Sequence, residues 1–167
     1  MAPVPADPAD APALAALRDQ AARWQLDRGI EQWRPGEVPA AAFADQARAG
    51  ELFVLRDPAG LVGAVRVVWA DPGIWGDPAA VGPAGYVHGL MVARSHTGRG
   101  IGAGLLDWAE RRVRAAGRDT VRLDCVAGNR PLRRYYRDRG YREVGRATFP
   151  GGELLPCTLF EKALGPP

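Results

Sequence analysis

The sequence is poor in the residues that build disulfide scaffolds and metal centres. Its 167 residues include two cysteines, Cys125 and Cys157, which are too far apart to form a C-x-x-C pair. Two cysteines are too few for a disulfide framework, and their spacing matches no zinc site. Both lie in apolar, strand-like segments, where cysteine behaves as a small hydrophobic residue. We therefore expect two buried free thiols and no bound metal.

Long apolar runs are absent as well. No stretch approaches the roughly 18 uninterrupted apolar residues of a membrane-spanning helix. Residues 1–12 are rich in Ala, Pro and Asp and contain no Lys or Arg, which does not fit a secretory signal. The sequence thus predicts a cytoplasmic protein with no membrane association. Residues 1–12 are expected to form a flexible tail with at most a short first strand, and residues 13–163 a single domain.

Lysine is nearly absent, and this excludes one large class of nucleotide-binding proteins. The single lysine, Lys162, lies far from the glycine-rich segment, whereas the P-loop of nucleotide triphosphatases ends in Gly-Lys-Ser/Thr. The net charge of +3 comes mainly from arginines, most of them in the second half of the chain. Aspartates and glutamates are interspersed among them, which is typical of a solvated face. We therefore do not expect nucleic acid as a partner.

The chain does contain a clear alternation of helical and strand-like segments. Apolar residues recur at helical spacing in some segments and form short β-rich runs in others. The prolines and glycines of residues 71–84 predict a long loop around Trp75. The order predicts an α+β fold with a single mixed, mostly antiparallel central sheet flanked by about four helices. Helices are predicted at residues 13–28, 39–49, 100–115 and 131–139, and strands at 51–56, 61–70, 85–92, 120–126, 141–149 and 154–162.

The most informative segment joins the strand at 85–92 to the helix at 100–115. Glycines alternate with other residues at Gly98, Gly100, Gly102 and Gly104. Without side chains in the way, several backbone N–H groups can point at one anion while the helix dipole adds partial positive charge. The segment therefore predicts a phosphate cradle.

A dinucleotide is one candidate ligand for this cradle. The spacing Gly98-x-Gly100-x-x-Ala103 fits the dinucleotide fingerprint, and Asp124 lies about 20 residues further on. That fold needs several further strand–helix units, whereas the segment after Asp124 ends in a predicted hairpin. A dinucleotide-binding protein is therefore the second interpretation.

A second motif favours another family. Asn129 is followed seven residues later by Tyr136, and Gly140-Tyr141 comes shortly after. Together with the glycine loop, this pattern resembles the GCN5-related N-acetyltransferase (GNAT) family over roughly residues 3–163. The family has Arg or Gln where this chain has Thr97, and Gly-Phe where it has Gly140-Tyr141.

The resemblance implies a fold, a co-substrate and a reaction. It implies a GNAT-type fold whose strands splay apart at the cofactor cleft, with acetyl-CoA as co-substrate and no metal. It also implies direct transfer of the acetyl group to a primary amine of a small molecule or peptide within a ternary complex. A non-catalytic acyl-CoA sensor is the alternative, and the sequence leaves a homodimer open.

The same resemblance assigns roles to individual residues. Tyr136 would hydrogen-bond or protonate the departing thiolate, which leaves the neighbouring Tyr135 as a core residue. Asn129 would contact the pantetheine arm, although its local pattern also fits a helix N-cap. The expected cofactor contacts are Leu90, Met91, Val92, Gly98, Arg99, Gly100, Ile101, Gly102, Ala103, Asn129 and Tyr136, with Gly89 suited to a local bulge.

His88 is predicted to accept the proton of the amine, and a separate pocket is predicted to bind the amine itself. Strand alternation places His88 on the same face as Leu90, and a histidine can accept a proton near neutral pH. By resemblance, the amine would lie against the turn after the first helix and the tip of the last hairpin around Gly151 and Gly152. Contacts with a cationic amine are expected from Glu31, Trp33 and Trp75, which would form a partly aromatic, partly acidic pocket.

Overall fold

The computed structural model describes residues 2–148 and 156–165. By their contacts the residues form two compact units, which are described separately. Unit 1 comprises Met1–Val67 and His88–Ala109, and unit 2 comprises Val68–Val87 and Glu110–Pro167. Strand β4 (Gly85–Val92) contributes to both units. The predicted contacts at Gly151 and Gly152 fall outside the described residues.

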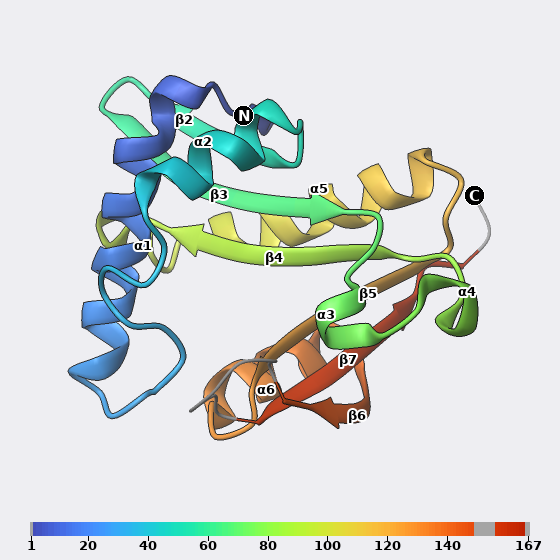
Figure 1. Ribbon diagram of the computed structural model, residues 1–167. Coiled ribbons are helices and arrows are strands. Elements are labelled where there is room, and N and C mark those ends of the chain that lie inside the picture. Colours follow the sequence, from blue (N-terminus) through green and yellow to red (C-terminus); the bar gives the residue numbers. More distant parts are fainter. Residues whose placement is uncertain (1, 149–155, 166–167) are drawn as a thin grey trace. The chain divides into compact units, whose positions relative to one another are not determined.

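The predicted order of helices and strands is confirmed, with most ends shifted by one or two residues. Among the described residues, seven strands form one open, mixed sheet in the order β1-β2-β3-β4-β5-β7-β6 (Figure 1). The helices are η1 (Pro8–Asp10), α1 (Ala11–Leu26), α2 (Ala40–Arg48), α3 (Pro72–Trp75), α4 (Pro78–Val81), η2 (Arg94–His96), α5 (Ile101–Ala115) and α6 (Arg130–Asp138). The strands are β1 (Val4–Pro5), β2 (Leu52–Asp57), β3 (Gly60–Val68), β4, β5 (Thr120–Val126), β6 (Arg142–Ala147) and β7 (Cys157–Ala163).

Unit 1 is built on the antiparallel strands β1, β2 and β3. Strand β2 opens with four consecutive buried residues, and its Leu52 and Val54 share one core cluster with Leu14 and Leu17 of α1. This arrangement explains the apolar stripe of α1, because that face of the helix packs into the core. The predicted N-terminal tail is partly structured: Val4 and Pro5 pair with β2, and Ala6 and Ala11 are buried.

Unit 2 is built on strands β5, β7 and β6, which pair antiparallel. The segment predicted as a loop at 71–84 contains the short helices α3 and α4. Each begins with a proline, and the carbonyl oxygens of Asp71 and Asp77 accept the first helical hydrogen bonds, from Trp75 and Val81. Proline is well tolerated at such a first position because its missing N–H would have no helical partner there.

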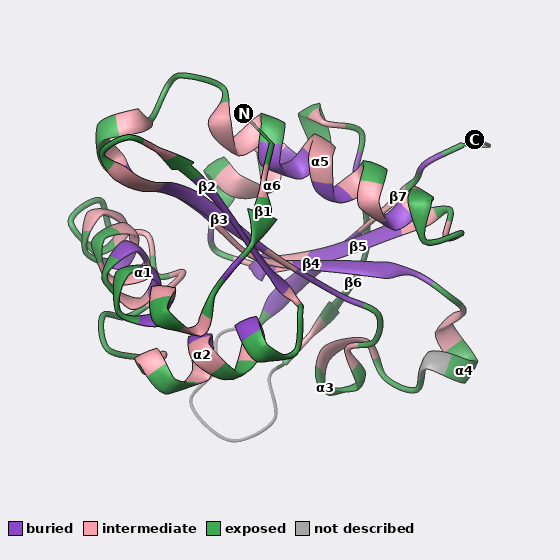
Figure 2. Ribbon diagram, turned by 90° about the horizontal axis from the view of Figure 1, so that it is seen from above, coloured by how far each residue is buried: buried purple, intermediate pink, exposed green. Residues whose placement is uncertain are grey.

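Most buried residues of the strands lie in β2, β3, β4, β5 and β7, whereas β1 and β6 are mostly exposed. Figure 2 shows the buried residues along the inner strands, while the outer sides of the helices are exposed. Both cysteines are free and buried, which confirms the prediction from their apolar surroundings. Within residues 2–148 and 156–165, no helix combines the length and the apolar character needed to cross a bilayer.

Candidate functional site

The glycine-rich segment joins β4 to α5, as predicted. After β4 the chain passes through η2, where the Thr97 hydroxyl donates a hydrogen bond to the carbonyl oxygen of Arg94 at 3.0 Å. Gly98 and Gly100 then adopt φ angles of 76° and 73°, left-handed values that glycine adopts without strain. Helix α5 begins at the next residue, Ile101. The first N–H groups of a helix have no helical acceptor, so this junction can bind an anion.

The first turn of α5 has space around its small residues. A Cβ built on Gly102 would meet Val92 Cγ2 at 3.6 Å, an ordinary contact, and one on Gly104 would meet nothing within 4 Å. Arg99 is exposed, so its guanidinium is accessible to a phosphate. The structure thus brings the predicted cradle residues together in one loop and one helical turn; these are Gly98, Arg99, Gly100, Ile101, Gly102 and Ala103.

Strand β4 changes geometry at Gly89, which has a φ angle of 56°. The backbone is not extended there, so the alternation that placed His88 and Leu90 on one face does not extend across this residue. A left-handed glycine fits the local bulge expected at this position. Beyond it, Met91 is buried in the core of unit 1, whereas Leu90 and Val92 are half-buried.

The pairing of β4 with its parallel neighbour β5 is short. Gly85 pairs with Val121 and Tyr86 with Arg122, and the described ladder ends there. Backbone groups later in β4 therefore take no part in this ladder. Backbone N–H and C=O groups that are not used in a ladder can bind a ligand that adds like a further strand.

Helix α6 carries Asn129 and the tyrosine pair. The side chain of Asn129 caps the helix by accepting a hydrogen bond from the N–H of Leu132 at 3.2 Å, as the local pattern predicted. Of the two tyrosines, Tyr136 is the buried one, at 6% exposure, whereas Tyr135 is half-buried. The prediction that Tyr135 is the core residue is therefore wrong, because α6 turns its apolar face so that Tyr136 packs 5.5 Å from Phe160.

Burial strongly affects the two groups near this tyrosine that could lose a proton. Burial, and then the nearby Cys125 and Asp124, raise the pKa of Tyr136 far above its ordinary value. Burial also raises the pKa of Cys125 to about 12. Near neutral pH both groups are protonated, so Tyr136 holds a proton that it can donate and Cys125 is a poor nucleophile.

Tyr141 stands where the resembled family has Phe, and its additional hydroxyl has a hydrogen-bond partner. The ring is buried, and its hydroxyl donates a hydrogen bond to Glu110 at 2.9 Å. The amino group of Lys162 also donates to Glu110, at 2.8 Å. The additional hydroxyl is thereby satisfied inside unit 2, where an unpaired polar group would be costly.

The turn after α1 differs from the acidic pocket expected for a cationic amine. The guanidinium of Arg18 lies 4.4 Å from the ring centroid of Trp33 and forms an ion pair with Glu37 at 2.6 Å. A cation of the chain itself thus covers a face of Trp33. Glu31 is exposed on the same turn.

Trp75 lies in α3, in an arginine–aromatic cluster that the sequence analysis missed. Its ring is 6.0 Å from that of Tyr86, and the guanidinium of Arg122 lies 5.2 Å from its centroid. In the part of the chain that the structure describes, the buried Nε1–H of Trp75 has no hydrogen-bond partner. Trp75 is thus partly a core residue, because it packs against Val68 and Ala84.

Arg122 holds this cluster together and is only 7% exposed. It donates hydrogen bonds to Glu161 and to the hydroxyl of Tyr86, both at 2.9 Å, and to the carbonyl oxygens of Val81 and Gly82. Burial disfavours its charge, but the bonds to Tyr86 and Glu161 outweigh this and raise the pKa of Arg122. The signal in the sequence is an arginine between the apolar residues Val121 and Leu123 of β5.

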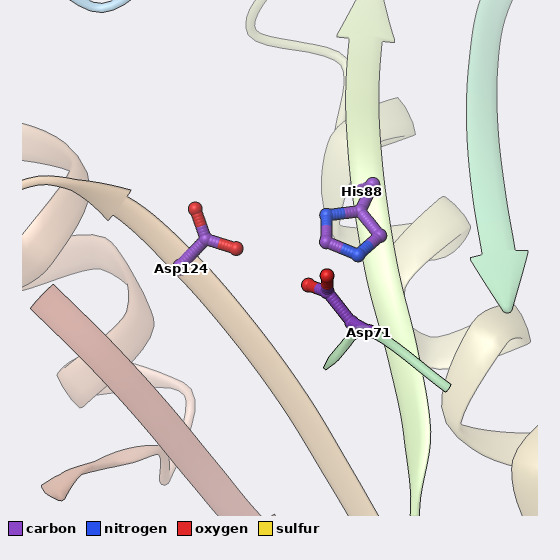
Figure 3. A group of neighbouring side chains, drawn as sticks. All are labelled: Asp71, His88 and Asp124. Carbon is purple, nitrogen blue, oxygen red and sulfur yellow. The ribbon is translucent and has the colours of Figure 1, made fainter. Parts of the chain in front are cut away.

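Two further carboxylates of unit 2 were not predicted as a pair. Oxygen atoms of Asp71 and Asp124 lie within 4.8 Å of each other, and both residues are half-buried. Figure 3 draws them together with the imidazole of His88, which is half-buried on β4. Asp71 precedes α3 directly, so the pair was hidden by the prediction of a structureless loop.

Comparisons with known proteins agree on one family. The model of the acetyltransferase (GNAT) family matches residues 18–141. The uncharacterized N-acetyltransferase YesJ of Bacillus subtilis (strain 168) is 32% identical, with 93% of this chain and 86% of YesJ covered.

Solved structures show the same fold. A GNAT-family acetyltransferase of Listeria monocytogenes is 24% identical with a TM-score of 0.77, covering 97% of this chain and 94% of that one. Another neighbour, yncA of Salmonella typhimurium with its cofactor acetyl-CoA, is 17% identical with a TM-score of 0.72, covering 99% and 94%. The family model and YesJ both cover well over half of the chain, and the fold agrees with them. The chain therefore belongs to the GNAT family of acetyltransferases.

Proposed function

We propose that the protein transfers the acetyl group of acetyl-CoA to a primary amine of a small molecule or peptide. The observation that carries this proposal is the loop before α5, where Gly98 and Gly100 take left-handed φ angles directly before the free N–H groups of the helix. Membership of an acetyltransferase family and the acetyl-CoA held by the Salmonella neighbour support the same ligand.

In the proposed reaction, separate groups of residues bind separate parts of acetyl-CoA. The cradle of Gly98 to Ala103 binds the pyrophosphate, and backbone groups of Leu90, Met91 and Val92 hold the pantetheine arm and the thioester carbonyl. Asn129 contacts the same arm. The amine nitrogen forms a bond to the acetyl carbon as the bond from that carbon to sulfur breaks. Holding both reactants together supplies much of the rate enhancement.

Two protons must move in this reaction. His88, directly or through water, accepts the proton that the attacking amine loses. Tyr136, whose hydroxyl is protonated at neutral pH, hydrogen-bonds to the leaving thiolate or supplies a proton to it. The acceptor contacts proposed for Glu31, Trp33 and Trp75, the cytoplasmic location and the homodimer stay predictions.

Acetyl-CoA should stabilise the protein against thermal unfolding, whereas NAD at the same concentration should not. Gly102→Val should abolish the acetyl-CoA shift, because the side chain would occupy the approach to the cradle. The fold should tolerate this change, since the Cβ meets only Val92 at 3.6 Å. Gly104→Ala on the same helix is the matched control and should retain the shift. Stabilisation by NAD alone would contradict the proposal.

Product formation separates an enzyme from a sensor. The wild-type protein is incubated with acetyl-CoA and a diverse amine library, and products are detected by a mass increase of one acetyl group. A protein that binds acetyl-CoA but acetylates no amine would be the acyl-CoA sensor instead.

His88→Gln should remove the acidic limb of the pH profile of kcat/KM. A histidine base must be neutral to accept a proton, and glutamine cannot act as a base, so any pH dependence that a histidine base imposes on kcat/KM should be absent from the variant. Amines of different basicity separate the ionisation of the acceptor from that of the enzyme. An unchanged profile at an unchanged rate would exclude His88 and leave water or Glu31 as the proton acceptor.

A further inference from the structure

Two guanidinium groups lie over the indole ring of Trp24, which belongs to the last turns of α1. The guanidinium carbon of Arg94 lies 3.7 Å from the indole centroid, and that of Arg28 lies 4.3 Å from it. The backbone N–H of Arg94 donates to Gln20 Oε1 at 3.0 Å, and Arg28 Nη1 donates to the carbonyl oxygen of Trp24 at 3.4 Å. All four residues belong to unit 1, so α1 and η2 hold the two cations on one aromatic support.

No acidic side chain neutralises these two cations within the described residues. Some arginines of unit 1 do have carboxylate partners: Arg18 pairs with Glu37, and Arg56 with Asp10 at 2.5 Å. Neither Arg28 nor Arg94 forms an ion pair in residues 2–148 and 156–165.

The environment also disfavours the charge of Arg94. Burial, and then repulsion by Arg28, lower its pKa. Cation–π contacts with Trp24 offset part of this cost, but an indole carries no net negative charge. An anion between the two guanidiniums would remove the repulsion.

In the sequence, Arg28 and Arg94 each lie close to a segment that is proposed to bind one of the two reactants, the amine and acetyl-CoA. Arg94 begins the segment that leads to the glycine cradle, and it follows Val92, a proposed pantetheine contact, by two residues. Arg28 lies at the start of the turn predicted to contact the amine. Guanidinium groups bind carboxylates and phosphates through paired hydrogen bonds, whereas a single point charge does not fix their geometry.

We propose that Arg28 and Arg94, supported by Trp24, form a binding site for an oxyanion of a bound ligand. This inference rests on the proposed function for the identity of the ligand. The oxyanion comes either from the 3′-phosphate of coenzyme A or from a carboxylate or phosphonate on the amine acceptor. In the second case the acceptor is an anionic amine, such as an amino acid, and not a purely cationic one.

The first arm of the test measures cofactor affinity by calorimetry. Coenzyme A and 3′-dephospho-coenzyme A are titrated into wild type, Arg94→Gln and Arg28→Gln, with Arg23→Gln on the exposed side of α1 as control. If the site binds the 3′-phosphate, removal of that phosphate weakens wild-type binding about 10-fold or more. The two site variants then bind both cofactors equally, and the control behaves like wild type.

The second arm measures acceptor kinetics. If the oxyanion belongs to the acceptor, the affinities for both cofactors are unchanged in all variants. KM for a carboxylate-bearing amine then rises about 10-fold or more in Arg94→Gln and Arg28→Gln, while KM for its methyl ester stays constant. Unfolding temperatures confirm that each variant is folded.

The two proposals fail in different ways. Wild-type protein that binds neither cofactor would contradict the proposed function. Wild-type protein that binds coenzyme A, with site variants that match Arg23→Gln in both arms, would overturn the oxyanion site alone.

Discussion

Replacing Tyr136 with Phe should lower kcat by roughly 10- to 1000-fold while leaving the affinity for acetyl-CoA nearly unchanged. The ring packs against Phe160 and Tyr141, at centroid distances of 5.5 and 5.9 Å, and phenylalanine can keep both contacts. The substitution removes the hydroxyl, which is protonated at neutral pH and is proposed to donate to the leaving thiolate. The measurement is steady-state kinetics together with a cofactor titration.

Tyr135→Phe is the matched control for this prediction. Tyr135 neighbours Tyr136 on α6 and is half-buried, so its hydroxyl should contribute little to kcat. Unfolding by urea checks that both variants are folded to the same extent. A Tyr136→Phe enzyme with wild-type kcat would make this residue a core tyrosine without a catalytic role.

Replacing Arg122 with Ala should destabilise the protein by about 3 kcal/mol. The guanidinium forms an ion pair with Glu161 and also satisfies two carbonyl oxygens that precede β4. Its removal leaves those acceptors and the Glu161 carboxylate without their partner. The expected loss lies at the low end for a broken buried pair because Glu161 is partly exposed to water. The free energy of unfolding is measured by urea denaturation at neutral pH.

A double variant tests whether charge burial causes this loss. Arg122→Met with Glu161→Leu removes both charges and keeps apolar volume, so it should recover much of the stability. The coupling energy follows from the cycle of the two single variants and the double variant. If Arg122→Ala unfolds at the same urea concentration as wild type, the cluster around Tyr86 does not depend on this arginine.

Features that depend on neighbouring residues were predicted well from the sequence. The glycine junction before α5 and the N-cap at Asn129 follow from local backbone rules, and the structure confirms both. The free thiols Cys125 and Cys157 also follow from their apolar surroundings. These features need no knowledge of which distant segments meet.

Features that depend on distant contacts were missed. Arg122 and Glu161 are 39 residues apart, and they meet because β5 and β7 pair in one register. Likewise, Gln20 and Arg94 are 74 residues apart. The alternation argument for His88 also failed at Gly89, because a left-handed φ angle is a property of the folded backbone and a glycine only permits it.

The buried thiol of Cys125 has a consequence for a protein that handles thioesters. Because burial raises its pKa to about 12, Cys125 is a protonated thiol at neutral pH. Thioester exchange requires a thiolate, so Cys125 is a very slow acceptor of an acetyl group and a poor partner for mixed disulfides with coenzyme A. Under the proposed function, the acetyl group is therefore not lost to this side chain.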